Sequence, residues 1–252
     1  MSAPSVAELR AVAQPQTTMD RRSGEHWAGL LYMRKLSIYA TWVLAKTPIS
    51  PNQVTGLMIV CGVLAGVVLA IPGFWAAVAA ALLIQVYLLL DCSDGELARW
   101  TGRTSIAGVY LDRVGHYLAE AALLIGLGFR ASQVLPDWYT VLGVAAALGA
   151  ILIKAETDLV DVARARSGLT AATEASAGHF QSRGLGAARK VAAALRFHRV
   201  IQAVELSLIV VVAALLDFWF PATRILTVAC AVIAGLQLVL HLVSILASRR
   251  LS

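Results

Sequence analysis

Four side chains between residues 91 and 116 have the types and spacing of a metal site. Asp91 and Asp94 are three residues apart, and Asp112 and His116 are four residues apart. Each pair therefore shares one face if its segment is helical. Three carboxylates supply the oxygen ligands that hard cations such as Mg2+ or Mn2+ prefer. Such a cation suits a pyrophosphate substrate, because it neutralises the charge of a departing phosphate.

Small and cationic residues lie between the two acidic pairs. Gly95 and Gly108 would let a phosphate or a planar base approach the backbone, and Arg99 offers a guanidinium fork for phosphate. Any one of the aspartates, taken alone, is equally consistent with an ordinary charged residue at the end of a membrane helix. The combined pattern of three Asp, two Gly and one Arg at helical spacing favours a site.

The chain around this pattern is that of an integral membrane protein. Of its 252 residues, 59% are hydrophobic and only 14% are charged, with a mean hydropathy of +0.74. Six segments approach the length of about 20 apolar residues that a membrane-crossing helix needs. These segments are 53–71, 75–98, 105–128, 138–162, 200–217 and 223–247. We therefore expect an all-α fold with six transmembrane helices.

The expected elements would bring the two acidic pairs together. The first pair falls at the end of the second apolar segment and the second pair at the start of the third. A short turn joins these segments, so they would pack antiparallel. All four side chains would then face one pocket near a membrane surface, where ionisable groups usually have a function.

The flanking regions predict the domain organisation. Residues 1–24 are polar and are expected to form a loosely ordered cytoplasmic tail. Residues 25–48 include a basic segment too short to cross, which predicts an interfacial amphipathic helix. Residues 49–252 would form the membrane domain, with a cytoplasmic loop over 163–199 and a short surface helix over 186–196.

The distribution of basic residues predicts the orientation in the inner membrane. Of 21 Lys and Arg, only Arg130 and Arg224 fall on the side opposite the pocket. The positive-inside rule then places both termini and the pocket in the cytoplasm. Because the basic residues lie between apolar runs and form no stripe, they favour a membrane surface or a phosphorylated substrate, and no nucleic acid is expected as a partner.

The order of these residues resembles the signature of the CDP-alcohol phosphotransferase family. That signature reads D-x2-D-G-x2-A-R-x8-G-x3-D-x3-D. The chain has Asp91, Asp94, Gly95, Ala98, Arg99, Gly108 and Asp112 at the corresponding positions, and His116 replaces the last Asp. The layout of the spans is also similar to the family, so the likeness covers most of residues 33–247. Residues 51–55, PNQVT, resemble the family segment that opens the first membrane helix and helps to hold the cytidine nucleotide.

The resemblance implies an activity and a set of site residues. The family transfers a phospho-alcohol from a CDP-alcohol to a hydroxyl acceptor and releases CMP. If the family's site residues are assigned to the matching positions of this chain, two divalent cations, Mg2+ or Mn2+, would be bound by Asp91, Asp94, Asp112 and His116. The CDP moiety would be bound by Asn52, Thr55, Gly95, Arg99, Ser105 and Gly108. The family also favours a homodimer, which agrees with the many small residues in the helices.

His116 is the one departure from the signature, at the position of the family's fourth ligand and catalytic base. Imidazole has a pKa near 6.5 and is a suitable base, but it is a poor ligand for Mg2+. The second cation site should therefore be weaker, or shifted toward Mn2+ or Zn2+. Glu120, one turn further along, could orient the imidazole or supply a carboxylate through water. Three hypotheses follow: His116 is the base, the base lies elsewhere, or the site is impaired.

The sequence signal for the site of the hydroxyl acceptor is less specific than that for the CDP-alcohol. Lys154, together with Arg164, Arg166 or Arg199, would receive a phosphorylated acceptor, whereas the alternative is an internal ion pair of Lys154 with Glu156 or Asp158. The N-terminal segment resembles the inositol-phosphate branch of the family more than the choline branch.

Two other classes of function compete with this interpretation. A UbiA-like prenyltransferase would need more spans and a second Asp-rich motif. A small transporter or ion-binding protein would place its acidic residues near the midplane, in broken helices.

Overall fold

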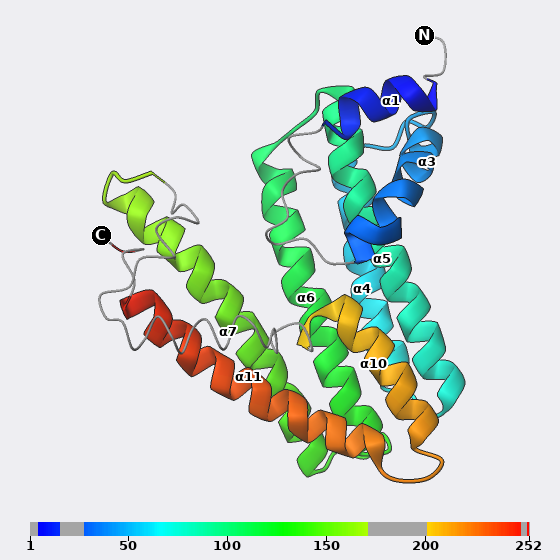
Figure 1. Cartoon of the computed structure of the whole chain (residues 1–252), viewed down its shortest axis with the longest axis vertical. Helices are drawn as coiled ribbons and strands as arrows, with labels where there is room; N and C mark the ends of the chain where they lie inside the picture. Colours follow the sequence, from blue (N-terminus) through cyan, green and yellow to red (C-terminus); the bar gives the residue numbers. More distant parts are fainter. Residues whose placement is uncertain (1–4, 16–27, 171–200, 248–250, 252) are drawn as a thin grey trace.

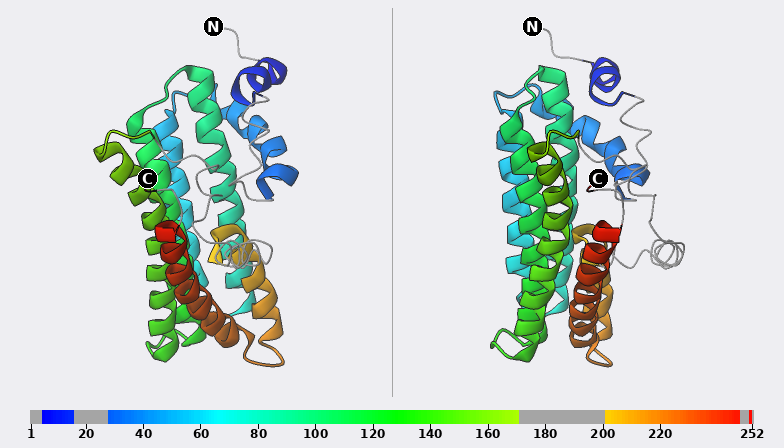
Figure 2. Two further views of the ribbon diagram at one scale, coloured as in Figure 1. Left: turned by 60° about the vertical axis from the view of Figure 1, so that its left-hand side comes forward. Right: turned by 90° about the vertical axis from the view of Figure 1, so that its left-hand side faces the viewer.

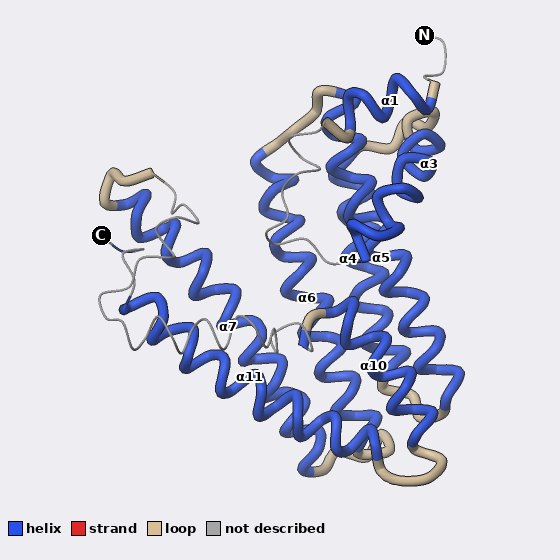
Figure 3. The backbone as a smooth tube through the Cα atoms, in the orientation of Figure 1, coloured by secondary structure: helices blue, strands red, loops and turns tan. Residues whose placement is uncertain are grey.

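The computed structural model describes residues 5–15, 28–170, 201–247 and 251. Within these ranges every regular element is a helix, which confirms the all-α class (Figure 3). The elements are α1 (Val6–Ala13), the short π-helix η1 (Gly29–Met33), α3 (Arg34–Leu44), α4 (Pro51–Leu69), α5 (Phe74–Thr101), α6 (Ile106–Ala131), α7 (Trp138–Arg166), α10 (Ala203–Leu216) and α11 (Ala222–Ala247).

Four of these helices, α4, α5, α7 and α11, are long and apolar enough to cross a membrane. The chain is therefore an integral membrane protein. Helix α6 has 26 residues, but charged residues along it, among them Asp112, Glu120 and Arg130, lower its hydropathy. Helix α10 has 14 residues, about 21 Å at 1.5 Å per residue, which is shorter than the hydrocarbon core of about 30 Å. The count of six spans therefore stays a prediction.

The helices form a bundle with α4, α5 and α6 at its centre. Helix α4 packs against both α5 and α6, while α10 lies on α5. Helices α7 and α11 run side by side at an angle to the central three, and α7 contacts α6 (Figure 1). The core between these elements is filled by apolar side chains such as Met58, Ile84, Leu123 and Leu206.

Glycines let α6 approach its two neighbours backbone to backbone. A Cβ added at Gly126 would collide with the carbonyl oxygen of Gly66 on α4. A Cβ added at Gly128 would lie 2.9 Å from Cα of Gly143 on α7. The close packing of small residues expected from the sequence therefore occurs inside the bundle, where it sets the position of α6 against α4 and α7.

The ends of α4, α5 and α6 are set by local sequence. Pro51 is the first residue of α4, and the Ser50 side chain caps it by accepting a hydrogen bond from the Gln53 amide. Helix α5 ends at Thr101 and is followed by the cap residue Gly102, whose φ of 64° is left-handed. Ser105 then caps α6. This turn makes α5 and α6 the antiparallel hairpin predicted from the sequence.

The N-terminal region differs from the expectation for residues 1–24. Residues 6–13 form α1, because Ser5 and Glu8 build a capping box and Leu9 packs against Ile38 of α3. The segment predicted as an interfacial helix contains η1 and α3. Helices α1 and α3 lie at the same end of the bundle as the α5–α6 turn (Figure 2). The helix predicted over 186–196 lies outside the described residues.

Candidate active site

A cavity of about 400 Å³ lies where the start of α4 meets the α5–α6 hairpin. All ten residues that the sequence assigned to cation and CDP binding line it: Asn52, Thr55, Asp91, Asp94, Gly95, Arg99, Ser105, Gly108, Asp112 and His116. Pro51, Ala98, Arg103, Thr104 and Val109 complete the lining. The structure thus brings the predicted residues together, and their individual roles stay predictions.

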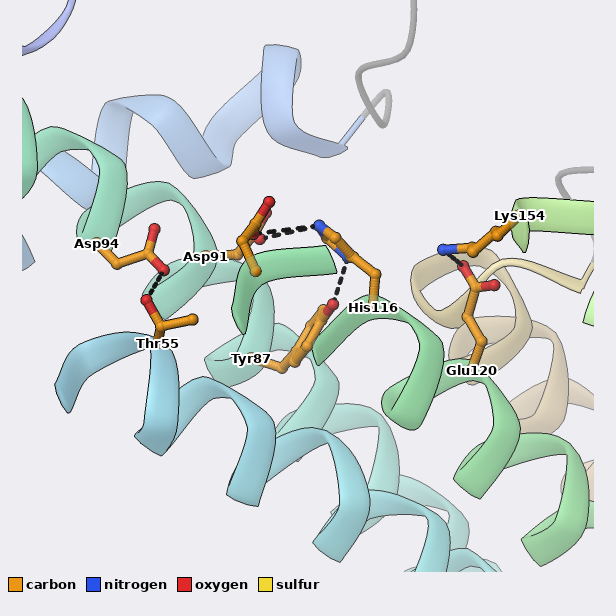
Figure 4. A network of polar contacts seen from close by, with 8 residues as sticks. Thr55, Tyr87, Asp91, Asp94, His116, Glu120 and Lys154 are labelled. Carbon is orange, nitrogen blue, oxygen red and sulfur yellow. Dashed lines mark hydrogen bonds and ion pairs between the residues drawn. The ribbon is translucent and has the colours of Figure 1, made fainter. Parts of the chain in front are cut away.

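Asp91, Asp112 and His116 form one group in this cavity. One possible ligand atom from each lies within 4.8 Å of the others. Nε2 of His116 is 3.3 Å from Oδ1 of Asp91 and 3.5 Å from Oδ1 of Asp112. Figure 4 shows Asp91 of α5 and His116 of α6 facing each other across the hairpin. Two carboxylates and an imidazole fit a divalent cation, and a mixed oxygen and nitrogen set suits Mn2+ or Zn2+ better than Mg2+.

Asp94 lies in the same cavity but outside this group of three. Its side chain is 8% exposed, and its Oδ2 accepts a hydrogen bond of 2.6 Å from the Thr55 hydroxyl (Figure 4). The sequence assigned Thr55 to the nucleotide. In the structure its hydroxyl holds the Asp94 carboxylate in one orientation, so Thr55 connects α4 to the acidic face of α5.

Tyr87 is a site residue that the sequence reasoning missed. Its hydroxyl oxygen lies 2.5 Å from Nδ1 of His116. The two rings contact edge to face, with their centroids 6.0 Å apart. Tyr87 is 2% exposed and lies one turn before Asp91 on α5. The four-residue spacing from Asp91 was the available signal, but it does not reveal that the partner is on α6.

A hydrogen bond in the lining of the cavity joins α4 to the start of α6. The Ser105 hydroxyl accepts a hydrogen bond of 3.0 Å from the Gly108 amide and donates one of 3.4 Å to Oδ1 of Asn52. A Cβ at Gly108 would lie 3.0 Å from the same Asn52 oxygen. Gly108 therefore has a structural role that the sequence did not indicate, because its missing side chain lets Asn52 reach α6.

Gly95 likewise leaves space for a neighbouring side chain, here that of Arg99. A Cβ at Gly95 would lie 3.3 Å from a terminal nitrogen of the Arg99 guanidinium. The space left by this glycine is therefore next to the guanidinium, and it lets Arg99 lie back along α5. Nε of Arg99 donates a hydrogen bond of 2.7 Å to the carbonyl oxygen of Ala13 in α1.

The sequence profile described as CDP-alcohol phosphatidyltransferase matches residues 48–247. The chain belongs to the CDP-alcohol phosphatidyltransferase family. The matched range includes the whole cavity described above and leaves α1 and α3 outside it.

Three relatives resemble parts of the chain. It is 29% identical over 147 residues to "Cholinephosphotransferase 1" of Homo sapiens, which covers 52% of this chain and 36% of that one. It is 29% identical over 141 residues to "Bifunctional IPC transferase and DIPP synthase" of Thermococcus kodakarensis, with shares of 56% and 31%. It is 30% identical over 124 residues to "Phosphatidylinositol phosphate synthase" of Streptomyces avermitilis, with shares of 48% and 48%. The chain therefore spans less than half the length of each relative.

A solved structure has the same fold. The crystal structure of Mycobacterium tuberculosis phosphatidylinositol phosphate synthase with CDP-DAG bound matches with a TM-score of 0.59 and 19% identity. The match covers 85% of this chain and 95% of that one. The chain therefore shares its all-helical fold with that synthase.

Lys154 of α7 pairs with a different carboxylate from those predicted. Its Nζ is 3.0 Å from Oε1 of Glu120 on α6, whose side chain is 8% exposed. The prediction of Glu156 or Asp158 as its partner was wrong, because α7 packs between two helices. Successive helical residues rotate by about 100°. Lys154 and Asp158 therefore face α6, whereas Glu156 faces α11.

The two other carboxylates of α7 have partners of their own. Oε2 of Glu156 lies 2.8 Å from Nδ1 of His241 on α11. Asp158 accepts hydrogen bonds of 2.6 Å from Arg113 and 2.5 Å from the Tyr117 hydroxyl, both on α6.

Among the residues that the structure describes, the predicted acceptor residues Lys154, Arg164 and Arg166 do not line the cavity. Glu120, proposed as a support for His116, instead contacts Lys154 (Figure 4). Arg164 lies near the end of α7, where its Nε donates a hydrogen bond of 2.7 Å to the carbonyl oxygen of Thr170. Arg199 lies outside the described residues.

Proposed function

We propose that this chain transfers a phospho-alcohol from a CDP-alcohol to a hydroxyl acceptor and releases CMP. The observation that carries the proposal is the convergence of the family's motif positions from α4, α5 and α6 on one cavity. The three aspartates, Arg99 and the Asn52–Ser105 contact all line this cavity. A pyrophosphate bound between them would place its charge among cations and its nucleotide against α4 and the start of α6.

Asp91, Asp94 and Asp112 would hold one or two divalent cations. When bound, such cations would neutralise the pyrophosphate oxygens and stabilise the charge of the departing CMP. Thr55 fixes the orientation of Asp94, and Arg99 adds a guanidinium that can donate two hydrogen bonds to one phosphate.

His116 would accept the proton of the acceptor hydroxyl at Nε2. The acceptor oxygen attacks the phosphorus that carries the alcohol, and a new P–O bond forms. The bond from this phosphorus to the bridging oxygen breaks, and CMP leaves with the electron pair. Nε2 cannot hold a proton and a cation at once, so this role leaves cation binding to the aspartates.

Tyr87 would make that role possible by fixing the ring. A phenol can both donate and accept a hydrogen bond. When the Tyr87 oxygen accepts from Nδ1–H of His116, the lone pair of the imidazole lies on Nε2, beside Asp91 and Asp112. Tyr87 is thus a positioning residue for the proton acceptor.

The Glu120–Lys154 pair marks our proposed acceptor site. It lies between α6 and α7, one turn beyond His116 along α6. A phosphorylated acceptor, such as a polyol phosphate, would bind Lys154 with help from Arg164. The donor would carry a phosphatidyl or an inositol-phosphate group.

We also propose six membrane crossings, a cytoplasmic cavity and termini, and a homodimer. Arg130 and Arg224 support the orientation, because both lie at the end of the bundle opposite the cavity. Arg130 donates hydrogen bonds to the carbonyl oxygens of Ile71 and Gly73 in the α4–α5 turn, and Arg224 donates to that of Ala131.

A screen of purified protein tests the activity. The chain would be incubated with CDP-diacylglycerol, CDP-inositol, CDP-glycerol or CDP-choline, each with several hydroxyl acceptors and Mg2+ or Mn2+. We expect CMP release with one donor class, in an amount equal to the phosphodiester product. Binding of a solute without CMP release from any donor would instead favour a transporter.

A further inference from the structure

Helix α1 lies outside the range matched by the family profile, yet it contacts Arg99, a residue that lines the cavity. Its buried face consists of Leu9 and Ala13, which are 0% exposed and pack against Ile38 of α3. Trp42 and Trp100 pack around this small cluster. Trp100 follows Arg99 directly, so the cluster connects the end of α5 to α1.

The last residue of α1 contacts a residue that lines the cavity. The carbonyl oxygen of Ala13 accepts the hydrogen bond from Nε of Arg99 at 2.7 Å. Carbonyl groups in the last turn of a helix lack partners within the helix and carry partial negative charge. Such a carbonyl is a good acceptor for a guanidinium. Because Nε is engaged by Ala13, the plane of the guanidinium is set by the position of α1.

The buried carboxylate of Glu96 on α5 binds the residue that follows α1 and two residues of α3. Glu96 is 0% exposed and accepts hydrogen bonds from Gln14 Nε2 at 2.7 Å, Ser37 Oγ at 2.6 Å and Thr41 Oγ1 at 2.7 Å. Gln14 also donates to the carbonyl oxygen of Arg34 at 2.7 Å. Burial of a carboxylate is costly unless it is hydrogen-bonded, so these contacts form together. Glu96 lies between Gly95 and Arg99 in the sequence, which ties α1 and α3 to the site.

We infer that the buried face of the N-terminal segment, formed by Leu9, Ala13 and Gln14, is a positioning element of the nucleotide site, which sets the guanidinium of Arg99 toward the phosphates of the donor. Leu9 and Gln14 act through Arg99 and do not touch the substrate. The inference rests on the proposed function, since it takes the cavity to be a site for a cytidine diphosphate. These three residues lie outside the matched range, whereas Val12 is on the exposed face of the same helix and has no part in the inference.

A double-mutant cycle on nucleotide affinity tests the inference. The variants are Leu9→Ala, Arg99→Ala and the double variant of the full chain, with Val12→Ala as the matched control. Val12 is on the same helix and is 49% exposed. Binding of CDP with Mg2+ would be measured by calorimetry in detergent, and the melting temperature would be recorded for each variant. Gln14→Leu provides a second perturbation in case Leu9→Ala folds poorly.

We expect Leu9→Ala and Gln14→Leu to weaken CDP binding by about tenfold, since one charge-assisted hydrogen bond is misplaced. Val12→Ala should leave affinity unchanged. In the Arg99→Ala background, Leu9→Ala should have no further effect on affinity. Additive losses in the cycle, or a lower melting temperature with unchanged affinity, would overturn the inference.

The outcome of this cycle is separable from that of the proposed function. Coupled binding without CMP release from any donor would leave the inference standing and refute the transfer activity. CMP release together with additive losses of affinity in the mutant cycle would support the transfer activity and refute the inference. Wild-type protein that binds no CDP would refute both.

Discussion

The hydroxyl oxygen of Tyr87 lies 2.5 Å from Nδ1 of His116, while Nε2 of the same ring faces Asp91 at 3.3 Å. One nitrogen is therefore held by a buried side chain of α5, and the other points into the acidic group. A carboxylate at position 116, as in the family signature, would need no such support, because its two oxygens are equivalent. The imidazole has two distinct nitrogens, and Tyr87 determines which one faces the cavity.

Removal of the Tyr87 hydroxyl should lower turnover while leaving the fold intact. The expected fall in kcat for Tyr87→Phe is about tenfold, because one buried hydrogen bond that fixes the ring is lost. Steady-state assays would measure it, with Tyr110→Phe as the control, since Tyr110 is 67% exposed on α6. An unchanged kcat in Tyr87→Phe would show that the ring needs no orientation by this contact.

Substitution of His116 should separate the three hypotheses for this position. General acid–base groups contribute about 100- to 10,000-fold to rates, so His116→Ala should lower kcat by at least about 100-fold. His116→Asp should keep measurable turnover, because a carboxylate can also accept the proton, and it should favour Mg2+ more strongly, since it adds an oxygen ligand beside the three aspartates. Turnover would be measured with each cation. Full activity in His116→Ala would place the base elsewhere.

The Glu120–Lys154 pair should affect binding of the phosphorylated acceptor and leave binding of the CDP-alcohol unchanged. We expect Lys154→Met to raise KM for a phosphorylated acceptor by about tenfold or more, since one charge-assisted contact is lost, with little change in KM for the CDP-alcohol. It should also lower the melting temperature, because Glu120 is left buried without its cation.

The double variant Lys154→Met/Glu120→Gln is the decisive control for this pair. Neutralising both partners should recover most of the lost thermal stability, because no unpaired charge stays buried. It should not recover the acceptor KM. If the double variant restores both quantities, the pair is only an internal ion pair.

Close helix contacts should make α6 sensitive to a single added methyl group. Gly128→Ala places Cβ 2.9 Å from Cα of Gly143, and overpacking of this kind costs about 1–3 kcal/mol. Thermal unfolding in detergent should show a lower melting temperature. Gly56→Ala is the matched control on α4, since a Cβ there meets nothing within 4 Å. Equal melting temperatures for both variants would contradict the packing described here.

The cavity was largely predictable because its residues follow local rules. Helical spacing put Asp91 beside Asp94 and Asp112 beside His116, and a turn of four residues between α5 and α6 is too short for any arrangement but an antiparallel hairpin. The apolar segment predicted from residue 53 begins within about two residues of the observed start of α4 at Pro51. These features depend only on neighbours in the sequence.

The contacts that sequence reasoning missed all depend on the register between helices. Nothing in the sequence of α5 marks Tyr87 as a site residue, because its partner His116 is on α6. The partner of Lys154 is Glu120 because of the rotation of α7 against α6. Helix α1 was overlooked because its apolar face is only two turns long, and its stability comes from α3 and the end of α5. Spacing within one helix does not determine any of these contacts.

The most direct test of the proposed transfer reaction is the measurement of CMP release in the presence and absence of a divalent cation. Wild-type protein with its CDP-alcohol and acceptor should release CMP with Mg2+ or Mn2+, stop when the cation is chelated, and recover when it is added back. Asp112→Asn should lower the rate by at least about 100-fold at saturating cation, because the acidic group loses a charged ligand. No release from any CDP-alcohol, or an unchanged rate in Asp112→Asn, would contradict the central claim that this acidic cavity cleaves the CDP-alcohol.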